Sequence, residues 1–195
     1  MLLQQKLRNT LQWNLPVEQQ LEALAQFDGI GEEELRELAA TCHKVTEAGI
    51  LIEYLGYERL RPYLPLFLGF LQDINWPAAR GASNMLLKAG KTIIPEIKRV
   101  FNEVQDDTMW HYWLLECLVE NFEKALVLEL KPELLDLIRR ADDDGVAIQA
   151  LRILKEKGLL FEEEIQRHYQ YLQQQYGNSP IWLENLEEEI YPDNA

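Results

Sequence analysis

Apolar residues recur at helical spacing along nearly the whole chain. No stretch alternates β-branched and polar residues, and no Asn-Gly or Asp-Gly pair separates two such stretches, so we expect no sheet. Proline, glycine and acidic residues mark where helices begin and end. Before Gly56 the pattern predicts three helices, the first from Pro16 to before Asp28, the second over residues 35–42, and the third from about residue 45 to residue 55.

From residue 57 onward, three segments follow one plan. Each has a proline in the first turn or so of an apolar helix, then an acidic corner that caps a second helix. The prolines are Pro65, Pro95 and Pro132, the corners lie at residues 73–75, 106–107 and 142–144, and the second helices cover residues 76–88, 108–121 and 145–157. Gly90 and Gly158 end the first and third segments, at 25 and 26 residues from their prolines. The second segment departs from this plan, and a poorly patterned stretch follows it.

This plan resembles the HEAT repeat, a helical hairpin that stacks on its neighbours. We therefore predict an all-α fold, a HEAT-like α-helical repeat bundle of stacked antiparallel helix pairs. The predicted organisation is a single domain over residues 1–195, with N-terminal helices at 1–56, the HEAT-like repeat region at 57–160, and C-terminal capping helices and a tail at 161–195. The last helix, near residues 180–191, is expected to pack on its own chain rather than on another one.

A more specific resemblance covers about residues 58–113. It rests on residues 54–57 (Tyr-Leu-Gly-Tyr) leading into Leu64-Pro65, on residues 71–77 (Leu-Gln-Asp-Ile-Asn-Trp-Pro), on residues 93–95 (Ile-Ile-Pro), and on Asp106-Asp107 before Trp110 and Trp113. The chain is similar here to the bacterial family filed as domain of unknown function 5071. The resemblance implies a compact HEAT-like bundle and assigns no activity.

Charge narrows the choice of partner. The net charge of −14 disfavours nucleic acids, because their binding depends on cationic side chains. Residues 1–60 carry 5 basic and 10 acidic residues, residues 61–160 carry 13 and 15, and residues 161–195 carry 1 and 8. The acidity therefore lies mainly on the flanks of the chain, where it suits solvated helix faces and helix starts, or alternatively a basic partner.

Localisation follows from what the chain lacks. Its longest apolar run, residues 63–71, is far shorter than the roughly 20 residues of a membrane span, and the N-terminus does not have the pattern of a signal peptide. Cys42 and Cys117 are far apart within helical patterns, which predicts two reduced, buried thiols. We expect a cytoplasmic protein that does not act at a membrane. The sequence does not indicate its oligomeric state.

Two aromatic segments are candidates for binding. The first is the corner around Trp76, where Trp76 and Arg80 lie one helical turn apart, although capping and packing also explain this corner. The second is residues 110–113, four successive ring side chains that one helix cannot point into a single core. Burial between repeats explains most of that run, and a binding surface around Tyr112 and Glu116 is the alternative.

Catalytic and metal sites are poorly supported. The chain has two serines, neither in a Gly-x-Ser-x-Gly turn, and its three histidines are scattered without a ligand pattern. Aligning residues 142–145 with a calcium loop places Arg140 and Leu151 where carboxylates are required. We therefore predict no metal, no cofactor and no enzymatic activity.

The function predicted from these patterns is a protein-interaction module that binds a protein or peptide, possibly a basic one. One variant is an immunity-type protein that neutralises a basic toxin. The alternatives are an enzyme on a HEAT-like scaffold that acts on a modified base or small ligand, and a structural module without a discrete site. The predicted contact residues are Trp76, Arg80, Asn84, His111, Tyr112 and Glu116.

Overall fold

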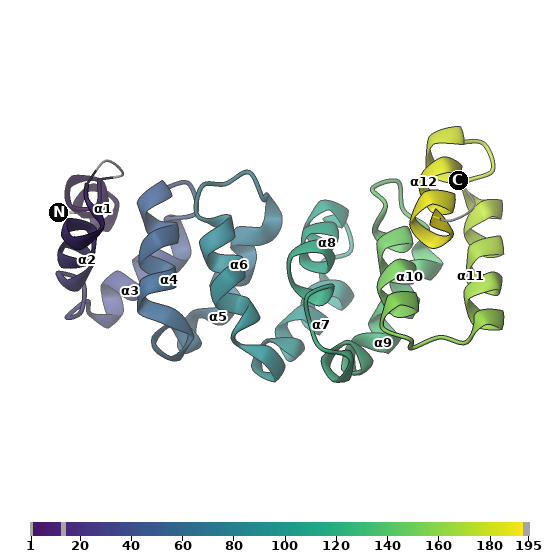
Figure 1. Cartoon of the computed structure of the whole chain (residues 1–195), viewed down its shortest axis with the longest axis horizontal. Coiled ribbons are helices and arrows are strands. Elements are labelled where there is room, and N and C mark those ends of the chain that lie inside the picture. The colour runs from purple at the N-terminus through teal and green to yellow at the C-terminus, as the bar shows by residue number, and fades with distance from the viewer. Residues whose placement is uncertain (1, 13–14, 193–195) are drawn as a thin grey trace. The chain divides into compact units, whose positions relative to one another are not determined.

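The computed structural model describes residues 2–12 and 15–192, and every regular element within these residues is a helix (Figure 1). The all-α prediction is confirmed. The chain divides into two compact units, residues 1–89 and residues 90–195. The boundary lies at Gly90, the glycine that the sequence pattern placed at the end of the first predicted repeat.

The first unit contains α1 to α6. The elements are α1 (Leu3–Thr10), α2 (Val17–Ala25), α3 (Glu32–Thr41), α4 (Thr46–Leu60), η1 (Arg61–Tyr63), α5 (Leu64–Leu68), η2 (Gly69–Gln72) and α6 (Ala79–Leu87). Their core includes Phe27, Leu51 and Phe67, all fully buried. The predicted stop at Gly56 appears as a kink with φ +72, after which the chain resumes a helical path to Leu60.

Two glycines let α4 and α6 approach each other closely. A Cβ atom added to Gly81 would lie 2.3 Å from the carbonyl oxygen of Gly49, which is closer than any real contact. Only a residue without a side chain fits there. The α4–α6 contact therefore depends on this glycine.

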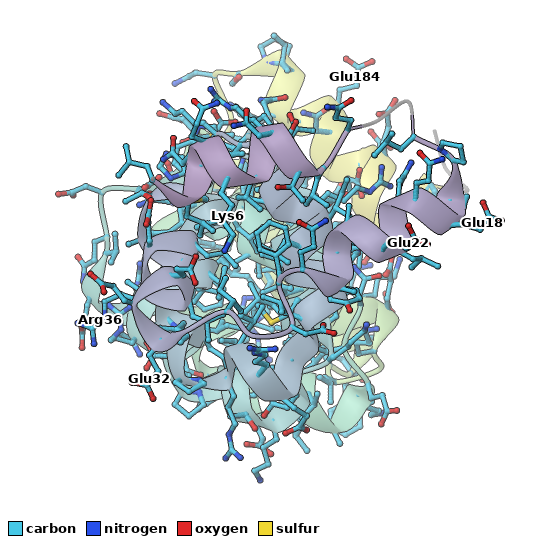
Figure 2. All side chains as sticks on the ribbon, turned by 90° about the vertical axis from the view of Figure 1, so that its left-hand side faces the viewer. Lys6, Glu18, Glu22, Glu32, Arg36 and Glu184 are labelled. Carbon is cyan, nitrogen blue, oxygen red and sulfur yellow. The ribbon has the colours of Figure 1, made fainter. Side chains whose placement is uncertain are left out.

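The charged side chains of the first unit differ in their surroundings. Figure 2 shows Lys6 directed from α1 toward α3, where its Nζ lies 2.9 Å from Glu34 Oε1 and 5.1 Å from the centroid of the Phe27 ring. Glu18 and Glu22 instead point outward from α2 (Figure 2). Lys6 thus joins two helices, while these acidic residues belong to the solvated surface.

The second unit contains α7 to α12. The elements are η3 (Gly90–Ile93), α7 (Ile94–Glu103), α8 (Thr108–Leu114), the π-helical segment η4 (Leu115–Val119), α9 (Lys124–Arg140), α10 (Val146–Glu156), α11 (Glu162–Gln175) and α12 (Pro180–Ile190). Its core includes Leu118, Ile138 and Leu151. Helix α12 packs against α10 and α11 of the same chain, as expected (Figure 1).

One helix start was predicted wrongly. Pro132 lies inside α9, eight residues after its first residue Lys124, rather than in its first turn. The helix tolerates the proline because Pro132 is exposed, so the carbonyl that loses its partner, that of Leu128, lies on the solvent side. The poorly patterned stretch after residue 122 is therefore helical from residue 124 onward.

One helix cap was also predicted wrongly. The carboxylate of Asp73 accepts a hydrogen bond from the backbone N–H of Asn75 at 2.9 Å, which closes a turn rather than capping a helix. Helix α6 begins at Ala79, and its N-cap residue Ala78 instead donates its N–H to the carbonyl of His43 at 3.1 Å. The other two acidic corners behave as predicted, and they shape the candidate site described below.

Two further expectations concern the cysteines and the membrane. Cys42 is buried but Cys117 is only half-buried, and neither forms a disulfide among the described residues. Within residues 2–12 and 15–192, no helix combines the length and apolar character needed to cross a bilayer. The predicted subdivision of the chain at residues 56 and 160 stays a prediction.

Candidate functional site

A pocket of about 380 Å³ opens in the second unit between α8, α10 and α12. Its walls combine aromatic rings, carboxylates and amides. The lining residues are Met109, Tyr112, Trp113, Asp144, Gly145, Ile148, Gln149, Trp182, Asn185 and Glu189. This volume is at the lower end of the range for small-ligand sites.

Helix α8 is positioned by its acidic corner. Asp107 accepts a hydrogen bond from the backbone N–H of Trp110 at 3.0 Å, as predicted for a helix cap. The helix then widens into the π-helical segment η4, a conformation that often accompanies functional sites. Tyr112 and Trp113 both line the pocket, and their rings meet edge to face with centroids 5.1 Å apart.

The second acidic corner holds the start of α10. The carboxylate of Asp142 accepts backbone hydrogen bonds from Asp144, Val146 and Ala147 at 2.8 to 3.0 Å. This cap fixes the loop that carries Asp144 into the pocket wall, where its carboxylate also accepts a hydrogen bond from the hydroxyl of Thr108. The corner therefore joins α8 to α10 and presents a negative charge to the pocket.

Gly145 brings the third aromatic ring close to the backbone. Its φ of +82 is in the left-handed region that favours glycine. A Cβ atom added there would lie 3.2 Å from the Trp182 ring and 3.9 Å from the Tyr112 ring. The absence of a side chain at this position thus leaves room for both rings.

Helix α12 forms the remaining wall. Trp182, Asn185 and Glu189 recur at helical spacing, so they lie on one face of α12 and all line the pocket. Leu186 and Ile190 are fully buried and anchor the helix to the unit.

A charge network lies beside the pocket. Arg152 contacts the carboxylates of Glu116, Glu120, Glu156 and Glu189, with nearest distances of 3.9, 2.7, 3.2 and 3.1 Å. Gln149 is 5% exposed; its amide nitrogen donates to Glu116 and Glu120, and its oxygen accepts from Arg152. One cation thus faces four carboxylates, and the network remains negative.

The pKa shifts agree with a partly dehydrated, negatively charged site. Burial raises the pKa of Glu116, and the neighbouring Glu120 raises it further. Burial also raises the pKa of the Tyr112 phenol, to which Glu116 and Glu189 add. The Cys117 thiol has a pKa of about 11, chiefly through burial, so it is protonated near neutral pH and is a poor nucleophile.

The predicted site residues of the second unit take different positions. Tyr112 lines the pocket, and Glu116 is tied to the lining residue Gln149 by a hydrogen bond of 2.8 Å. His111 is 1% exposed and packs edge to face on Phe101, with Nε2 3.3 Å from the Val100 carbonyl oxygen. Its ring faces the core and is not accessible to a partner, so His111 does not belong to the candidate site.

The other predicted residues belong to the first unit. The Trp76 ring contacts that of His43 at a tilt of 42°, with centroids 4.3 Å apart, and Lys44 Nζ lies 5.8 Å from the centroid of the indole. Arg80 is exposed, and the amide of Asn84 donates to Glu53 at 2.6 Å. A shallow hollow of about 220 Å³ adjoins Trp76, and it has no acidic lining. The structure therefore does not bring these three residues into the pocket.

The contributions of α12 and of the Arg152 network to the site were not predicted from the sequence. The spacing of Trp182, Asn185 and Glu189 marks a single helix face, although none of the three was among the predicted contact residues. Pairing that face with Tyr112 requires contacts about 70 residues apart, which periodicity cannot supply. In the part of the chain that the structure describes, no group of three or more His, Cys, Asp or Glu side chains is arranged to hold a metal ion.

Comparison with known proteins gives one match. A family model described as Domain of unknown function (DUF5071) matches residues 40–154. No curated protein and no solved structure matches the chain. The matched residues include the pocket walls from α8 and α10, whereas the wall from α12 lies beyond them.

Proposed function

The chain belongs to the family described as Domain of unknown function (DUF5071), and from this premise we propose that it is a cytoplasmic, non-catalytic protein-interaction module on a HEAT-like scaffold. The observation that carries the proposal is the open pocket whose lining includes three aromatic residues and two carboxylates. Tyr and Trp are enriched among the residues that dominate binding energy at protein interfaces. A pocket of this kind suits an anchoring side chain of a partner.

The HEAT-like part of the proposal rests on consecutive helix pairs. Helices α5 and α6, α7 and α8, and α9 and α10 are in contact within each pair, as hairpin repeats require. Gly90 and Gly158, which follow the first and third pairs, both have positive φ and allow the chain to reverse after a helix. The irregular position of Pro132 is the departure from a uniform repeat.

Charge supports a basic protein as the partner. The net charge is −14, and the pocket wall contributes Asp144 and Glu189. Electrostatic complementarity speeds association and selects partners of opposite sign. An immunity-type role against a basic toxin is one form of this proposal, consistent with the acidity of the chain.

An enzyme that acts on a modified base or small ligand is the second candidate. The raised pKa of Glu116, close to a pocket of small-ligand size, is the observation in its favour. Against it, the Glu116 carboxylate accepts a hydrogen bond from Gln149 and lies beside the Arg152 network. A structural module without a discrete site would leave the pocket and its half-buried aromatic lining unexplained.

A capture experiment tests the proposal. The full chain is immobilised and compared with Tyr112→Ala, which removes a pocket wall, and with Trp76→Ala, an aromatic change in the other unit. We expect a stoichiometric basic protein that the native chain and Trp76→Ala retain and that Tyr112→Ala loses. Its affinity should fall about tenfold or more between 50 and 300 mM NaCl, because screening weakens attraction between exposed charges.

Equal thermal melting of the three proteins is the control for folding. Capture that is unaffected by Tyr112→Ala, or affinity that does not change with salt, would contradict the proposed surface. Turnover of a small ligand that stops in Glu116→Gln would favour the enzyme instead.

A further inference from the structure

We infer that the pocket binds a guanidinium group, the side chain of an arginine presented by the basic partner. The inference rests on the proposed interaction function, and it names the chemical group that the aromatic and acidic walls recognise. Three independent features lead to it: the rings, the carboxylates and the state of the only arginine already present at this place among the described residues.

Three aromatic side chains line the space that a planar cation would occupy. Tyr112, Trp113 and Trp182 all line the pocket, and the Tyr112 and Trp113 planes lie at 83° to each other. A cation near such rings is attracted by their π-electron density, and guanidinium stacks on aromatic faces better than ammonium does. Gly145 lets the Trp182 and Tyr112 rings approach the start of α10, because a Cβ atom there would lie 3.2 Å from Trp182 and 3.9 Å from Tyr112.

The carboxylates provide charge and directional acceptors. Asp144 lines the pocket from the α10 corner, and Glu189 lines it from α12, so a bound cation meets acids from two elements. Guanidinium presents a rigid fork of N–H donors that matches a carboxylate. An anion would be repelled here, and an apolar group would remove water from the acids without replacing its hydrogen bonds.

Arg152 shows that carboxylates at this pocket already bind a guanidinium group. Arg152 binds Glu120 through both terminal nitrogens, at 2.7 and 3.2 Å, and its Nε lies 3.1 Å from Glu189. Its single charge is outnumbered by the four carboxylates around it. Glu189 belongs both to this network and to the pocket lining, so a second guanidinium group bound in the pocket neutralises part of the excess negative charge.

The test uses the full chain and blocked Gly-Arg-Gly peptides. Binding is followed by NMR through the indole N–H signals of Trp113 and Trp182, with Trp76 in the other unit as an internal reference. We expect weak binding, on the order of millimolar, since one side chain supplies the contacts. The peptide with citrulline, which has a similar shape without the charge, should bind roughly tenfold more weakly, and the lysine peptide should also bind more weakly.

Variants on α12 make the test specific to the pocket. Glu189→Gln should weaken arginine binding roughly tenfold, whereas Glu188→Gln, an exposed neighbour outside the pocket lining, should leave it unchanged. Because Glu189→Gln also removes an ion pair to Arg152, Asn185→Asp is the second variant. It adds a carboxylate to the lining and should strengthen arginine binding severalfold, which a loss of folding cannot imitate.

The outcomes separate the two proposals. Equal binding of arginine and citrulline peptides, or tighter binding of lysine, would overturn the inference. If the arginine peptide does not shift Trp113 or Trp182 while Tyr112-dependent capture of a protein succeeds, the inference is wrong and the interaction function stands. If the peptide binds as expected while no protein is captured, the guanidinium site stands and the interaction function fails.

Discussion

The imidazole of His111 is enclosed by apolar side chains although it lies in the aromatic run next to the candidate site. It packs on Phe101, and because a carbonyl oxygen can only accept, its Nε2 donates to Val100. Burial lowers the pKa of His111, so the folded protein favours the neutral ring. This residue stabilises the fold through its uncharged form.

At the scale of the residue, the prediction concerns how the stabilising effect of His111 depends on pH. The His111 ring binds a proton more readily in the unfolded chain than in the folded one. Its contribution to the free energy of unfolding is therefore complete above the unfolded pKa of about 6.5 and is lost as pH falls through the lowered folded pKa. His111→Phe should cost about 1 kcal/mol at pH 7.5 through the lost hydrogen bond. In urea unfolding, the difference in the free energy of unfolding between the native chain and His111→Phe should be smaller at pH 5 than at pH 7.5. A difference that does not change with pH would contradict a neutral His111 in the folded protein.

At the scale of elements, the α4–α6 contact permits a sharp test. Gly81→Ala should destabilise the first unit by about 1–3 kcal/mol or more, because the new methyl group would overlap the backbone of Gly49. Gly69→Ala is the matched control, since a Cβ there meets nothing within 4 Å. It should be neutral or slightly stabilising. If urea unfolding shows that the two variants lose similar amounts of stability, the close approach of α4 and α6 is not important for the stability of the unit.

After residue 15, helix order and many helix ends could be predicted from the sequence because local chemistry sets them, whereas α1 (Leu3–Thr10) was not predicted. Asp107 and Asp142 cap the helices that were assigned to them, and Gly90 and Gly158 take the conformation expected after a helix. Pro132 misled the prediction, since proline favours a first turn but is also tolerated on an exposed helix face. The predicted resemblance to the DUF5071 family is confirmed.

The candidate site could be predicted only in part. Four successive rings at residues 110–113 cannot share one core, and this constraint pointed to a binding surface around Tyr112, which lines the pocket. The same argument could not tell which ring is enclosed, and His111 is the one that lies deepest. Glu189 and Arg152 join the site through contacts between distant helices, which no local pattern encodes.

The whole molecule carries a large excess of negative charge. With a net charge of −14, the folded chain repels itself at low ionic strength, where the Debye length is about 30 Å at 0.01 M. Raising NaCl to 0.3 M should therefore increase the melting temperature, by roughly 2–4 °C if the repulsion costs about 1 kcal/mol. The same salt should weaken the complex with a basic partner, so stability and affinity should change in opposite directions.

A charge variant provides the control for the salt prediction. Glu187→Gln combined with Glu188→Gln removes two exposed negative charges from α12. The melting temperature of this variant should depend less on salt than that of the native chain. A melting temperature that falls as salt is added would mean that ion pairs such as Lys6–Glu34 outweigh the general repulsion.

The composite wall of the pocket limits what the family match implies. The faces from α8 and α10 lie within the residues shared with the family, while the α12 face lies outside them. Positions 182, 185 and 189, which complete the pocket, are therefore not described by the family model. The guanidinium specificity proposed here is therefore a property of this chain, and the family match alone does not extend it to other members.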